Sequence, residues 1–456
     1  MRRLTARHAR LGPIWMCFAL AAVSAWPDTA AAQVQNKRET QVRGDIAKFE
    51  ADESWVYNDW YKAVAEAKKS GKPLMVILRC VPCEACSEFD DQLVRRVDEV
   101  RDLMDQFVCA RIITTNGLDL DLFQFDYDQS FHAFLMNADG TVYGRFGTRS
   151  ESRDETQDMT MQGFRRALAT ALTWHQKYPE NKQLFTAKRG PKPLVAHPED
   201  YPILKATDRY KSELDYTGNI VQSCIHCHQV REAERHFYRD AGKPIPEDVL
   251  YPYPLPKVIG LTMNAEEACE VKAVASGSPA AEAGLRAGDT LIDFGGQPLL
   301  SIADLQWVLH RAPSKTVLPV GYRRGRDLGV TEIRLSEGWR AKSDLSWRVT
   351  TWDLRRAAFG GMKLDDVPDE ERSSLKLGPD ALALRAEHVG QYGAHAKAKQ
   401  AGFQKGDVIV EVDGARTRMT ETQLLAKNLA EHKPGESVPV KVVRGGREVS
   451  LQLPIQ

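Results

Sequence analysis

Five consecutive residues, Cys224-Ile225-His226-Cys227-His228, have the types and spacing needed to hold a haem covalently. Two thiols separated by two residues reach the two vinyl groups of one porphyrin, and the histidine that follows can ligate the iron. The motif therefore predicts a c-type haem, with Cys224 and Cys227 as the thioether residues and His228 as the proximal ligand. The same residues also suit a structural disulfide or half of a zinc site.

The second axial ligand of such a haem is open between two side chains. Met263 follows the motif at a plausible distance along the chain, whereas His236 lies closer and would give bis-histidine ligation. The predicted metal ligands are His228 and Met263, with His236 as the alternative.

A second cysteine cluster, Cys80, Cys83 and Cys86, lies between an apolar run at 74–78 and a segment compatible with a helix from residue 87. The first turn of a helix has unpaired N–H groups and a positive dipole end, which stabilise a thiolate and lower a cysteine pKa. Such a thiolate can attack a disulfide or a peroxide, and a neighbouring cysteine then resolves the intermediate.

The segments around this cluster alternate between helix and strand. Buried apolar runs predict strands, an Asn-Ala-Asp-Gly turn at 137–140 predicts a hairpin, and an amphipathic pattern predicts the last helix. The predicted elements are a helix at 60–67, strands at 74–78, 107–112, 131–136 and 141–146, and a helix at 161–174. This order predicts an α/β domain with a central sheet.

The arrangement resembles the thioredoxin superfamily, particularly its exported thioredoxin-like members. The resemblance implies that Cys83 attacks and Cys86 resolves, with Cys80 as a rival nucleophile. Thioredoxins have a cis-proline before the strand that corresponds to 134–136, and this chain has no proline there, which argues against general dithiol oxidoreductase activity.

Two further side chains of this domain have a chemical and a structural interpretation. His132 can bind a metal or tune a thiol, although a single histidine at such a place is more often packed or solvated. Cys109 lies in an apolar strand and is expected to be buried and structural.

The N-terminus has the features of a secretory signal peptide. Four arginines precede an apolar run at 14–25, and Ala30-Ala31-Ala32 supplies a cleavage site after residue 32. Later segments lack an apolar run of about 18 residues, so we expect a soluble, periplasmic or otherwise exported chain without a stable membrane span. Disulfides persist in that compartment.

Charge and cysteine count add two limits. The chain has 62 basic and 62 acidic residues, and the signal segment contains four Arg and one Asp, so 58 basic and 61 acidic residues remain. This balance gives no reason to expect nucleic acid as a partner. Seven of the eight cysteines follow the signal segment, and the odd number implies at least one free or unusual thiol.

Residues 178–256 are rich in proline, lysine and aspartate and cannot hold a large core of their own. The segment must be clamped onto its neighbours or organised by something other than packing. The Cys-x-x-Cys-His motif lies within it, between two stretches compatible with short helices, so a covalent haem would supply the missing core.

The C-terminal half contains a duplication. Residues 283–292, Ala-Gly-Leu-Arg-Ala-Gly-Asp-Thr-Leu-Ile, match residues 401–410, Ala-Gly-Phe-Gln-Lys-Gly-Asp-Val-Ile-Val, and hairpin signals follow at 324–326 and 444–447. Both copies resemble bacterial PDZ domains, the first more closely. PDZ domains bind extended or C-terminal peptides as an added strand, and a glycine-containing loop captures the carboxylate.

Carried over by position, this resemblance gives two candidate carboxylate loops. They are Ile259-Gly260-Leu261-Thr262 in the first copy and Phe359-Gly360-Gly361-Met362 in the second. The facing helices are expected at 302–310 and 422–429. Alternatively, one or both grooves are filled internally or serve only as spacers. Three tryptophans between the copies indicate that this connector packs: Trp339, Trp347 and Trp352.

The predicted fold is multidomain, with an α/β thioredoxin-like domain, a small and mostly helical Cys-x-x-Cys-His segment, and two mainly β PDZ domains of α+β type. The expected segments are a signal peptide (1–32), an N-terminal extension (33–54), the thioredoxin-like domain (55–177), the Pro-rich connector (178–256), a first PDZ domain (257–337), a Trp-rich connector (338–358) and a second PDZ domain (359–456). The whole order is similar to a bacterial family of thioredoxin-like/PDZ proteins, some with selenocysteine at the redox position.

This resemblance favours an exported thiol-redox protein, with thiol-disulfide or peroxide chemistry, PDZ modules that recruit peptides of other exported proteins, and haem c as a cofactor. The alternatives are a non-catalytic scaffold or quality-control adaptor and an electron-transfer protein of cytochrome type. PDZ pairs commonly follow a serine-protease domain, but the chain has no Gly-x-Ser-Gly-Gly-type segment, so the sequence predicts that it is not a protease.

Overall fold

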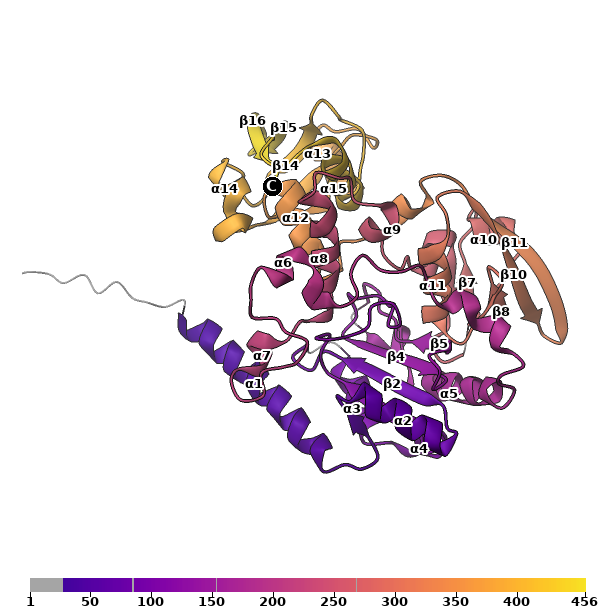
Figure 1. The fold of residues 1–456 in the computed structure, drawn as a ribbon. Helices are drawn as coiled ribbons and strands as arrows, with labels where there is room; N and C mark the ends of the chain where they lie inside the picture. The colour runs from indigo at the N-terminus through magenta and orange to yellow at the C-terminus, as the bar shows by residue number, and fades with distance from the viewer. Residues whose placement is uncertain (1–27, 84–85, 153, 268) are drawn as a thin grey trace, which may run out of the picture.

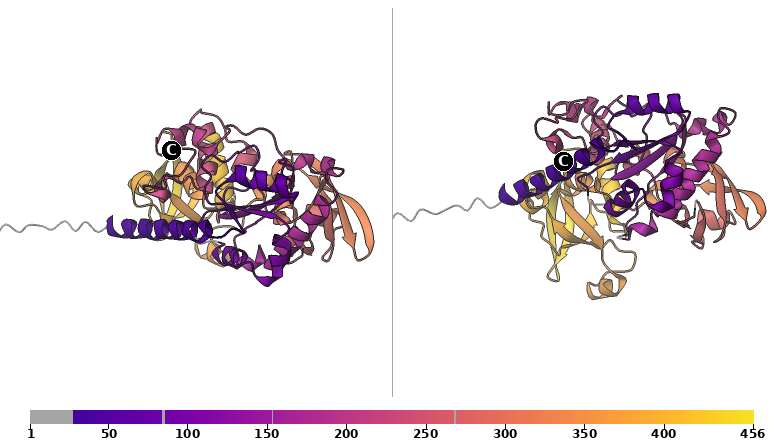
Figure 2. Two further views of the ribbon diagram at one scale, coloured as in Figure 1. Left: turned by 60° about the horizontal axis from the view of Figure 1, so that its bottom comes forward. Right: turned by 90° about the horizontal axis from the view of Figure 1, so that it is seen from below.

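The computed structural model describes residues 28–83, 86–152, 154–267 and 269–456. Figure 1 shows a first sheet unit at the bottom, a second at the right and a third at the top. Helix α1 (Asp28–Glu50) projects from the body of the molecule, as both views in Figure 2 show, and the C-terminal part of the helix packs on α7 and on the first unit. The predicted signal peptide lies outside the described residues as far as residue 27, and residues 28–32 belong to α1.

The first unit has a central sheet with helices on both faces. Its sheet order is β1-β3-β2-β4-β5, in which β1, β3 and β2 are parallel and β4 and β5 are antiparallel to their neighbours. The elements are β1 (Val56–Tyr57), α2 (Trp60–Ser70), β2 (Leu74–Arg79), α3 (Ser87–Val94), α4 (Asp98–Met104), β3 (Val108–Ile112), β4 (Phe131–Met136), β5 (Val142–Phe146), η1 (Glu155–Gln157) and α5 (Met161–His175).

Side-chain alternation along β2 divides the core of this unit into two layers. Leu74, Val76 and Leu78 point to one face, whereas Met75 and Ile77 point to the other, which α3, α4 and α5 cover. We call the Pro-rich connector, residues 178–256, the middle segment, and its buried side chains pack against the first of these layers.

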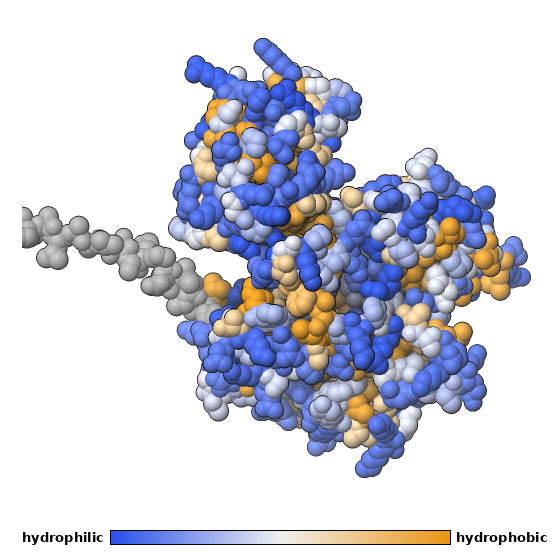
Figure 3. Space-filling view, turned by 45° about the horizontal axis from the view of Figure 1, so that its top comes forward, coloured by the Kyte–Doolittle hydropathy of each residue, from blue (hydrophilic) through white to orange (hydrophobic). Residues whose placement is uncertain are grey.

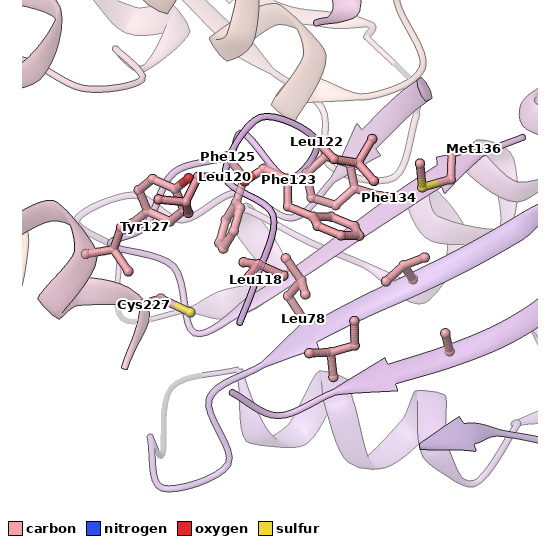
Figure 4. Close-up of a cluster of buried hydrophobic side chains, with 14 of the residues drawn as sticks. Leu78, Leu118, Leu120, Leu122, Phe123, Phe125, Tyr127, Phe134, Met136 and Cys227 are labelled. Atoms are coloured by element: carbon pink, nitrogen blue, oxygen red, sulfur yellow. Dashed lines mark hydrogen bonds between the residues drawn. The ribbon is translucent and has the colours of Figure 1, made fainter. Parts of the chain in front are cut away.

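The middle segment lies against the first layer. Its elements are η2 (Lys182–Lys188), η3 (Pro198–Asp200), α6 (Pro202–Lys205), α7 (Ile220–Ser223), α8 (Cys227–Arg239) and α9 (Glu247–Leu250). Tyr201, Leu204 and Val230 pack into the same buried cluster as Leu78. Figure 4 shows Cys227 at the edge of this cluster, near Leu78 and Leu118. The segment is therefore clamped onto its neighbour, which is one of the two possibilities that its composition left open.

The second and third units repeat one design. The second has a four-stranded sheet, β11-β10-β8-β9, beside a β6-β7 pair, and the third has a five-stranded sheet, β12-β13-β14-β15-β16. Elements of the second are η4 (Pro256–Ile259), β6 (Leu261–Met263), β7 (Val271–Val274), α10 (Pro279–Glu282), β8 (Thr290–Phe294), β9 (Gln297–Pro298), α11 (Ile302–Arg311), β10 (Thr316–Arg324) and β11 (Asp327–Leu335). A connector with η5 (Trp339–Lys342) and α12 (Thr351–Phe359) leads to β12 (Met362–Asp366), α13 (Asp369–Ser374), β13 (Leu384–Val389), η6 (Gly393–Ala396), α14 (Lys397–Gln400), β14 (Val408–Val412), α15 (Glu421–Glu431), β15 (Ser437–Arg444) and β16 (Arg447–Pro454).

The duplicated Gly-Asp turns have the same role in both copies. Asp289 is fully buried and binds Arg324 at 2.7 Å, and Asp407 binds Arg444 at 2.6 Å in the equivalent place. Each arginine is the last residue of the first strand of the closing hairpin, so the ion pair joins the Gly-Asp turn to that hairpin. The repeat seen in the sequence is thus also a repeat of tertiary contacts.

Charged side chains join the units. Arg348 of the Trp-rich connector is 3% exposed and binds Asp126 at 2.8 Å and Asp128 at 3.0 Å in the first unit. Trp339 is buried in the same connector, whereas Trp352 is exposed. Figure 3 shows hydrophilic residues over most of one face of the molecule, with smaller hydrophobic areas between the lobes.

Candidate functional site

The Cys80 and Cys83 thiols lie in contact at the end of β2. Their Sγ atoms are 2.9 Å apart, and a turn with Cys83 N–H donating to the Cys80 carbonyl at 3.0 Å sets this geometry. Cys80 is 5% exposed, whereas Cys83 is only half-buried. Cys83 is therefore the thiol that a substrate can reach.

Arg79 fixes the conformation of the turn between Cys80 and Cys83 through hydrogen bonds. Its buried guanidinium donates to the carbonyl oxygens of Cys80 at 2.8 Å and Cys83 at 2.9 Å, and its Nε binds Asp90 at 3.0 Å. Asp90 in turn accepts from Arg111 at 2.7 Å. A charged group fixed on two carbonyls gives the loop one conformation and places a positive charge beside the sulfurs.

The two thiols differ in acidity. The hydrogen bond from Cys80 is the main reason that the pKa of Cys83 is lowered to about 7, and the charge of Arg79 lowers it further. The same hydrogen bond, together with burial, raises the pKa of Cys80 well above its ordinary value. Near neutral pH, Cys83 is thus partly a thiolate, and Cys80 is the thiol that donates to it.

Cys86, which the sequence predicted as the partner of Cys83, is engaged elsewhere. It precedes α3 with a φ of 61°, its N–H donates to Glu155 at 2.8 Å, and its side chain bonds with Ser130. Burial raises the pKa of Cys86. The sulfur–sulfur contact is therefore formed by Cys80, the rival residue of the sequence analysis, because the turn begins directly after β2.

A cleft of about 170 Å³ opens beside Cys86. Thr148, Arg149 and Glu155 of the first unit line it together with Trp347 of the connector. Arg149 also lowers the pKa of Cys83 through its charge. The cleft offers both an aromatic and a polar wall next to the reactive loop.

The Cys-x-x-Cys-His segment lies directly on the loop that follows β3. Thr115 Oγ1 donates to the Ile225 carbonyl at 2.8 Å, and the Ile225 N–H donates to Asn116 at 2.7 Å. His226 Nδ1 lies 3.2 Å from the Cys80 Sγ atom. The two Cys-x-x-Cys segments, 141 or more residues apart in sequence, thus form one cluster, which we call the four-cysteine cluster: Cys80, Cys83, Cys224 and Cys227.

The four-cysteine cluster encloses little space. Cys80, Cys224 and Cys227 line a cavity of about 10 Å³, room for one water molecule, together with Leu78 and Ile225. Cys224 and Cys227 are each 7% exposed. A ligand the size of haem needs a pocket of about 300 Å³ or more. The residues present therefore do not fit a haem. The haem prediction is supported by the sequence motif alone.

The predicted axial ligands do not converge either. Met263 packs in the core of the second unit, whereas Cys227 packs against the sheet of the first. His228 stacks on His226 with ring centres 5.5 Å apart, and His236 binds Asp353 and Asp240. His236 lies two turns further along α8 than His228, so the two imidazoles cannot share one iron.

The remaining candidates of the first unit are structural. His132 is 2% exposed and stacks on Phe125 at 4.9 Å, which is the packed alternative of the sequence analysis. Cys109 is buried in β3, and burial raises its pKa to about 12, as expected for an unreactive thiol.

The facing helix of the first repeat, α11, has no free face. Residues 303–310 are all buried, Asp304 binds Lys188 at 2.8 Å, and the Trp307 indole donates to the Ala187 carbonyl at 3.0 Å. Of the predicted loop, Gly260 has a φ of +86° and its N–H donates to Lys257, while Ile259 and Leu261 are buried and Thr262 is exposed. The Arg145 N–H of β5 also donates to Asp304, at 3.1 Å. The middle segment and the first unit therefore both pack on the helix that would line a peptide groove (Figure 1).

The groove of the second repeat is closed by α12 of the connector. The N–H groups of Gly360 and Gly361, which were predicted to bind a carboxylate, both donate to the Arg355 carbonyl, and Phe359 and Met362 are buried in the core. The Arg355 side chain binds Glu421 of α15 at 2.6 Å, and this carboxylate also accepts from the Leu364 N–H of β12 at 2.8 Å. One N–H of the edge strand and both N–H groups of the loop are thus bonded within the chain.

Comparison with known families agrees with this fold. A thioredoxin-like family model matches residues 55–138, and two PDZ domain models match residues 270–324 and 395–455. The chain contains a thioredoxin-like domain and two PDZ domains, as predicted. PDZ domains bind peptides, which gives the class of partner without a specific one.

Curated relatives come from one class of protein. A probable periplasmic serine endoprotease DegP-like protein of Marinomonas sp. (strain MWYL1) is 28% identical over 37% of this chain and 33% of its own length. The periplasmic pH-dependent serine endoprotease DegQ of Escherichia coli (strain K12) is 28% identical over 41% and 37%. The chain thus spans about a third of the length of these relatives. A solved structure of the HtrA-type protease AlgW with decapeptide has a TM-score of 0.19 at 21% identity, covering 28% of this chain and 36% of that one.

These relatives contradict the prediction that the chain is not a protease. That prediction depended on the absence of a nucleophile motif, whereas both relatives are named as serine endoproteases. The absence of a familiar motif was therefore too weak a reason for the exclusion. Among the described helices, none has the length and apolar character needed to cross a membrane.

Sequence reasoning missed two residues of the site. Arg79 is the one charged residue of an otherwise apolar strand and directly precedes Cys80, which was a usable signal. His226 lies inside the second Cys-x-x-Cys pair, and its contact with Cys80 has no local signal.

Proposed function

We propose that this chain is an exported thiol-redox protein in which Cys83 attacks a disulfide of a polypeptide and Cys80 resolves the intermediate. The contact between these two sulfurs, with the lowered pKa of Cys83, is the observation that carries the proposal. Signal-peptide features of the N-terminus and the periplasmic relatives support export.

The reaction balances in two steps. The Cys83 thiolate attacks one sulfur of a substrate disulfide and forms a mixed disulfide, and the other substrate sulfur leaves as a thiolate. The Cys80 thiol then loses its proton and attacks the Cys83 Sγ, which releases the second substrate thiol and leaves a Cys80–Cys83 disulfide. Two electrons pass from the protein to the substrate.

His226 is placed to orient the Cys80 thiol in the second step. Burial lowers the pKa of His226 to about 4, so its imidazole is neutral at physiological pH. Once Cys83 is held in the mixed disulfide, Nδ1 can accept a hydrogen bond from the Cys80 thiol, 3.2 Å away, and orient it toward the Cys83 sulfur. The proton of Cys80 ends on the leaving substrate sulfur, which is a stronger base than this imidazole.

The test compares two cysteine variants in insulin-disulfide reduction. We expect Cys83→Ser to lower the rate by about 100-fold or more, because removal of a nucleophile costs orders of magnitude. Cys86→Ser, the matched control three residues away, should keep the rate within about twofold, since Cys86 lies outside the sulfur contact. Full activity in Cys83→Ser would refute the proposal.

A second candidate, polypeptide binding or processing through the PDZ domains, is favoured by the endoprotease relatives. It predicts that the chain binds or cleaves an unfolded protein such as casein and that Cys83→Ser changes neither property. Casein turnover combined with inactivity toward insulin disulfides would establish this function in place of the first.

A further inference from the structure

The buried half of the four-cysteine cluster is a second redox site. We propose that Cys224 and Cys227 form a reserve dithiol that exchanges directly with the Cys80–Cys83 pair inside the protein. The proposal rests on the proposed function, since it assigns the source of electrons for the outer pair.

The geometry selects Cys80 as the shared sulfur. Cys80 touches Cys83 on one side, and on the other it lines the small cavity that Cys224 and Cys227 also line. No side chain needs to leave the cluster for the inner and outer pairs to meet. The inner pair is buried by the 113–115 loop and by Ile225, so an external disulfide of polypeptide size reaches it only through the outer pair.

The local structure suits a disulfide between the inner cysteines. Cys224 is the C-cap residue of α7 and Cys227 begins α8, so Ile225 and the N-cap residue His226 separate them, as in Cys-x-x-Cys pairs at a helix start. The Glu39 carboxylate accepts from the Ile220 and Val221 N–H groups and fixes α7 in place.

A metal explains the cluster less well. Throughout the described part of the chain, the one set of three possible ligand atoms that lie within 4.8 Å of one another is Asp413, Glu431 and His432 in the second PDZ domain. No three sulfurs of the four-cysteine cluster, whose residues are all described, lie within 4.8 Å of one another, whereas the ligands of a tetrahedral zinc site converge on one point.

The exchange balances without another reactant. The Cys227 thiolate attacks Cys80 Sγ of the oxidised outer pair, the Cys80–Cys83 bond breaks and Cys83 leaves as a thiolate. Cys224 then attacks Cys227 Sγ, and Cys80 leaves. The outer pair gains two electrons and two protons, and the inner pair loses them to form a Cys224–Cys227 disulfide.

The direction of exchange follows the acidities. Burial raises the pKa of Cys224 to about 11, whereas the pKa of Cys83 is about 7. The more acidic thiol is the better leaving group, and a disulfide between more basic thiols is the more stable one. Burial also raises the pKa of Cys227, so both inner thiols are basic, whereas the outer pair combines the basic thiol of Cys80 with the acidic thiol of Cys83. The reserve pair therefore gives its electrons to the outer pair.

The first test counts electrons in the full-length chain. Fully reduced protein, freed of reductant, is mixed with an excess of a disulfide-bonded peptide, and the reduced peptide is counted by chromatography. Wild type should reduce two disulfides per molecule, and Cys224→Ser should reduce one. One disulfide per molecule in both proteins would overturn the reserve pair alone, whereas zero in wild type would overturn the proposed function.

The second test maps the disulfide in the wild-type chain and uses one variant, Cys83→Ser, as a parallel sample. Reduced wild-type protein is oxidised with one equivalent of the same peptide per chain, that is, half an equivalent per dithiol pair. The remaining thiols are alkylated, and the disulfide is located by mass spectrometry. We expect the Cys224–Cys227 disulfide with alkylated Cys80 and Cys83, and no oxidation of Cys224 in a parallel Cys83→Ser sample. A Cys80–Cys83 disulfide with free inner thiols, one tightly bound zinc per chain, or inner cysteines blocked by thioether bonds would each overturn the proposal.

Discussion

Cys80→Ala tests the origin of the Cys83 acidity. The hydrogen bond from Cys80 is the largest cause of the lowered pKa of about 7. Without this donor, the pKa of Cys83 should rise toward the ordinary cysteine value of about 8.5. The attack on a disulfide depends on this pKa in two opposing ways, through the thiolate fraction and through the intrinsic nucleophilicity.

The two effects can be compared in size. At pH 7, the thiolate fraction of Cys83 falls from about one half to about 3%, a loss of about 16-fold. A rise of about 1.5 pKa units increases the nucleophilicity about 5-fold at a Brønsted slope of about 0.45. Attack should therefore become about 3-fold slower at pH 7 and about 4-fold faster at pH 9.5, where both proteins are ionised.

The assay follows release of pyridine-2-thione from 2,2′-dithiodipyridine as a function of pH. The wild-type rate should rise through pH 7 and then level, the Cys80→Ala rate should rise through about pH 8.5, and the two curves should cross. Cys86→Ala is the control and should retain the wild-type midpoint. A Cys80→Ala curve with its midpoint still near 7 would refute the role assigned to the Cys80 hydrogen bond.

Three further outcomes follow from the packing. Arg348→Met leaves the Asp126 and Asp128 carboxylates buried without their cation, so urea unfolding should show a loss of about 3–5 kcal/mol, and a loss below about 1 kcal/mol would contradict the buried ion pair. Arg355→Ala leaves Glu421 without its cation under α12 and should open the second PDZ groove, giving at least about tenfold tighter binding of C-terminal peptides by fluorescence anisotropy. Arg356→Ala is the matched control, and equal binding by both variants would show that α12 does not close the groove. Protein made in a host that matures c-type cytochromes should have no haem absorption band after acid-acetone extraction, because the cavity at Cys224 holds one water, and a retained band would show that this packing changes.

The thioredoxin-like domain was largely predictable because its strands carry local signals. The apolar run 74–78 became β2, and the turn at 137–140 does join β4 to β5. The two-residue strand β1 and the seven-residue helix α4 were not predicted, since elements of that length show no period. The hairpins of the two repeats were predictable for a similar reason: Gly445 and Gly446 both have positive φ, as a two-residue turn requires.

The site was predictable only in its parts. Each Cys-x-x-Cys pair is visible in the sequence, but the choice between Cys80 and Cys86 as partner of Cys83 depends on where β2 ends, and boundaries are the least certain feature of a sequence prediction. The contact of His226 with Cys80 and the closure of both PDZ grooves are contacts between distant segments. Such contacts depend on how whole units dock, which no local pattern records.

The weakness of the haem prediction lies in one premise, that the proline-rich connector needs a core from a cofactor. Tyr201, Leu204 and Val230 obtain that core from the face of the thioredoxin-like sheet that carries Leu78. Because the motif begins α8, this docking also brings Cys227 beside Cys80, so the packing that removes the need for a macrocycle also produces the sulfur cluster. A haem bound at Cys224 would have to displace the Thr115 and Ile225 contacts that hold the connector on the sheet, and it would thereby undo the core it was invoked to supply.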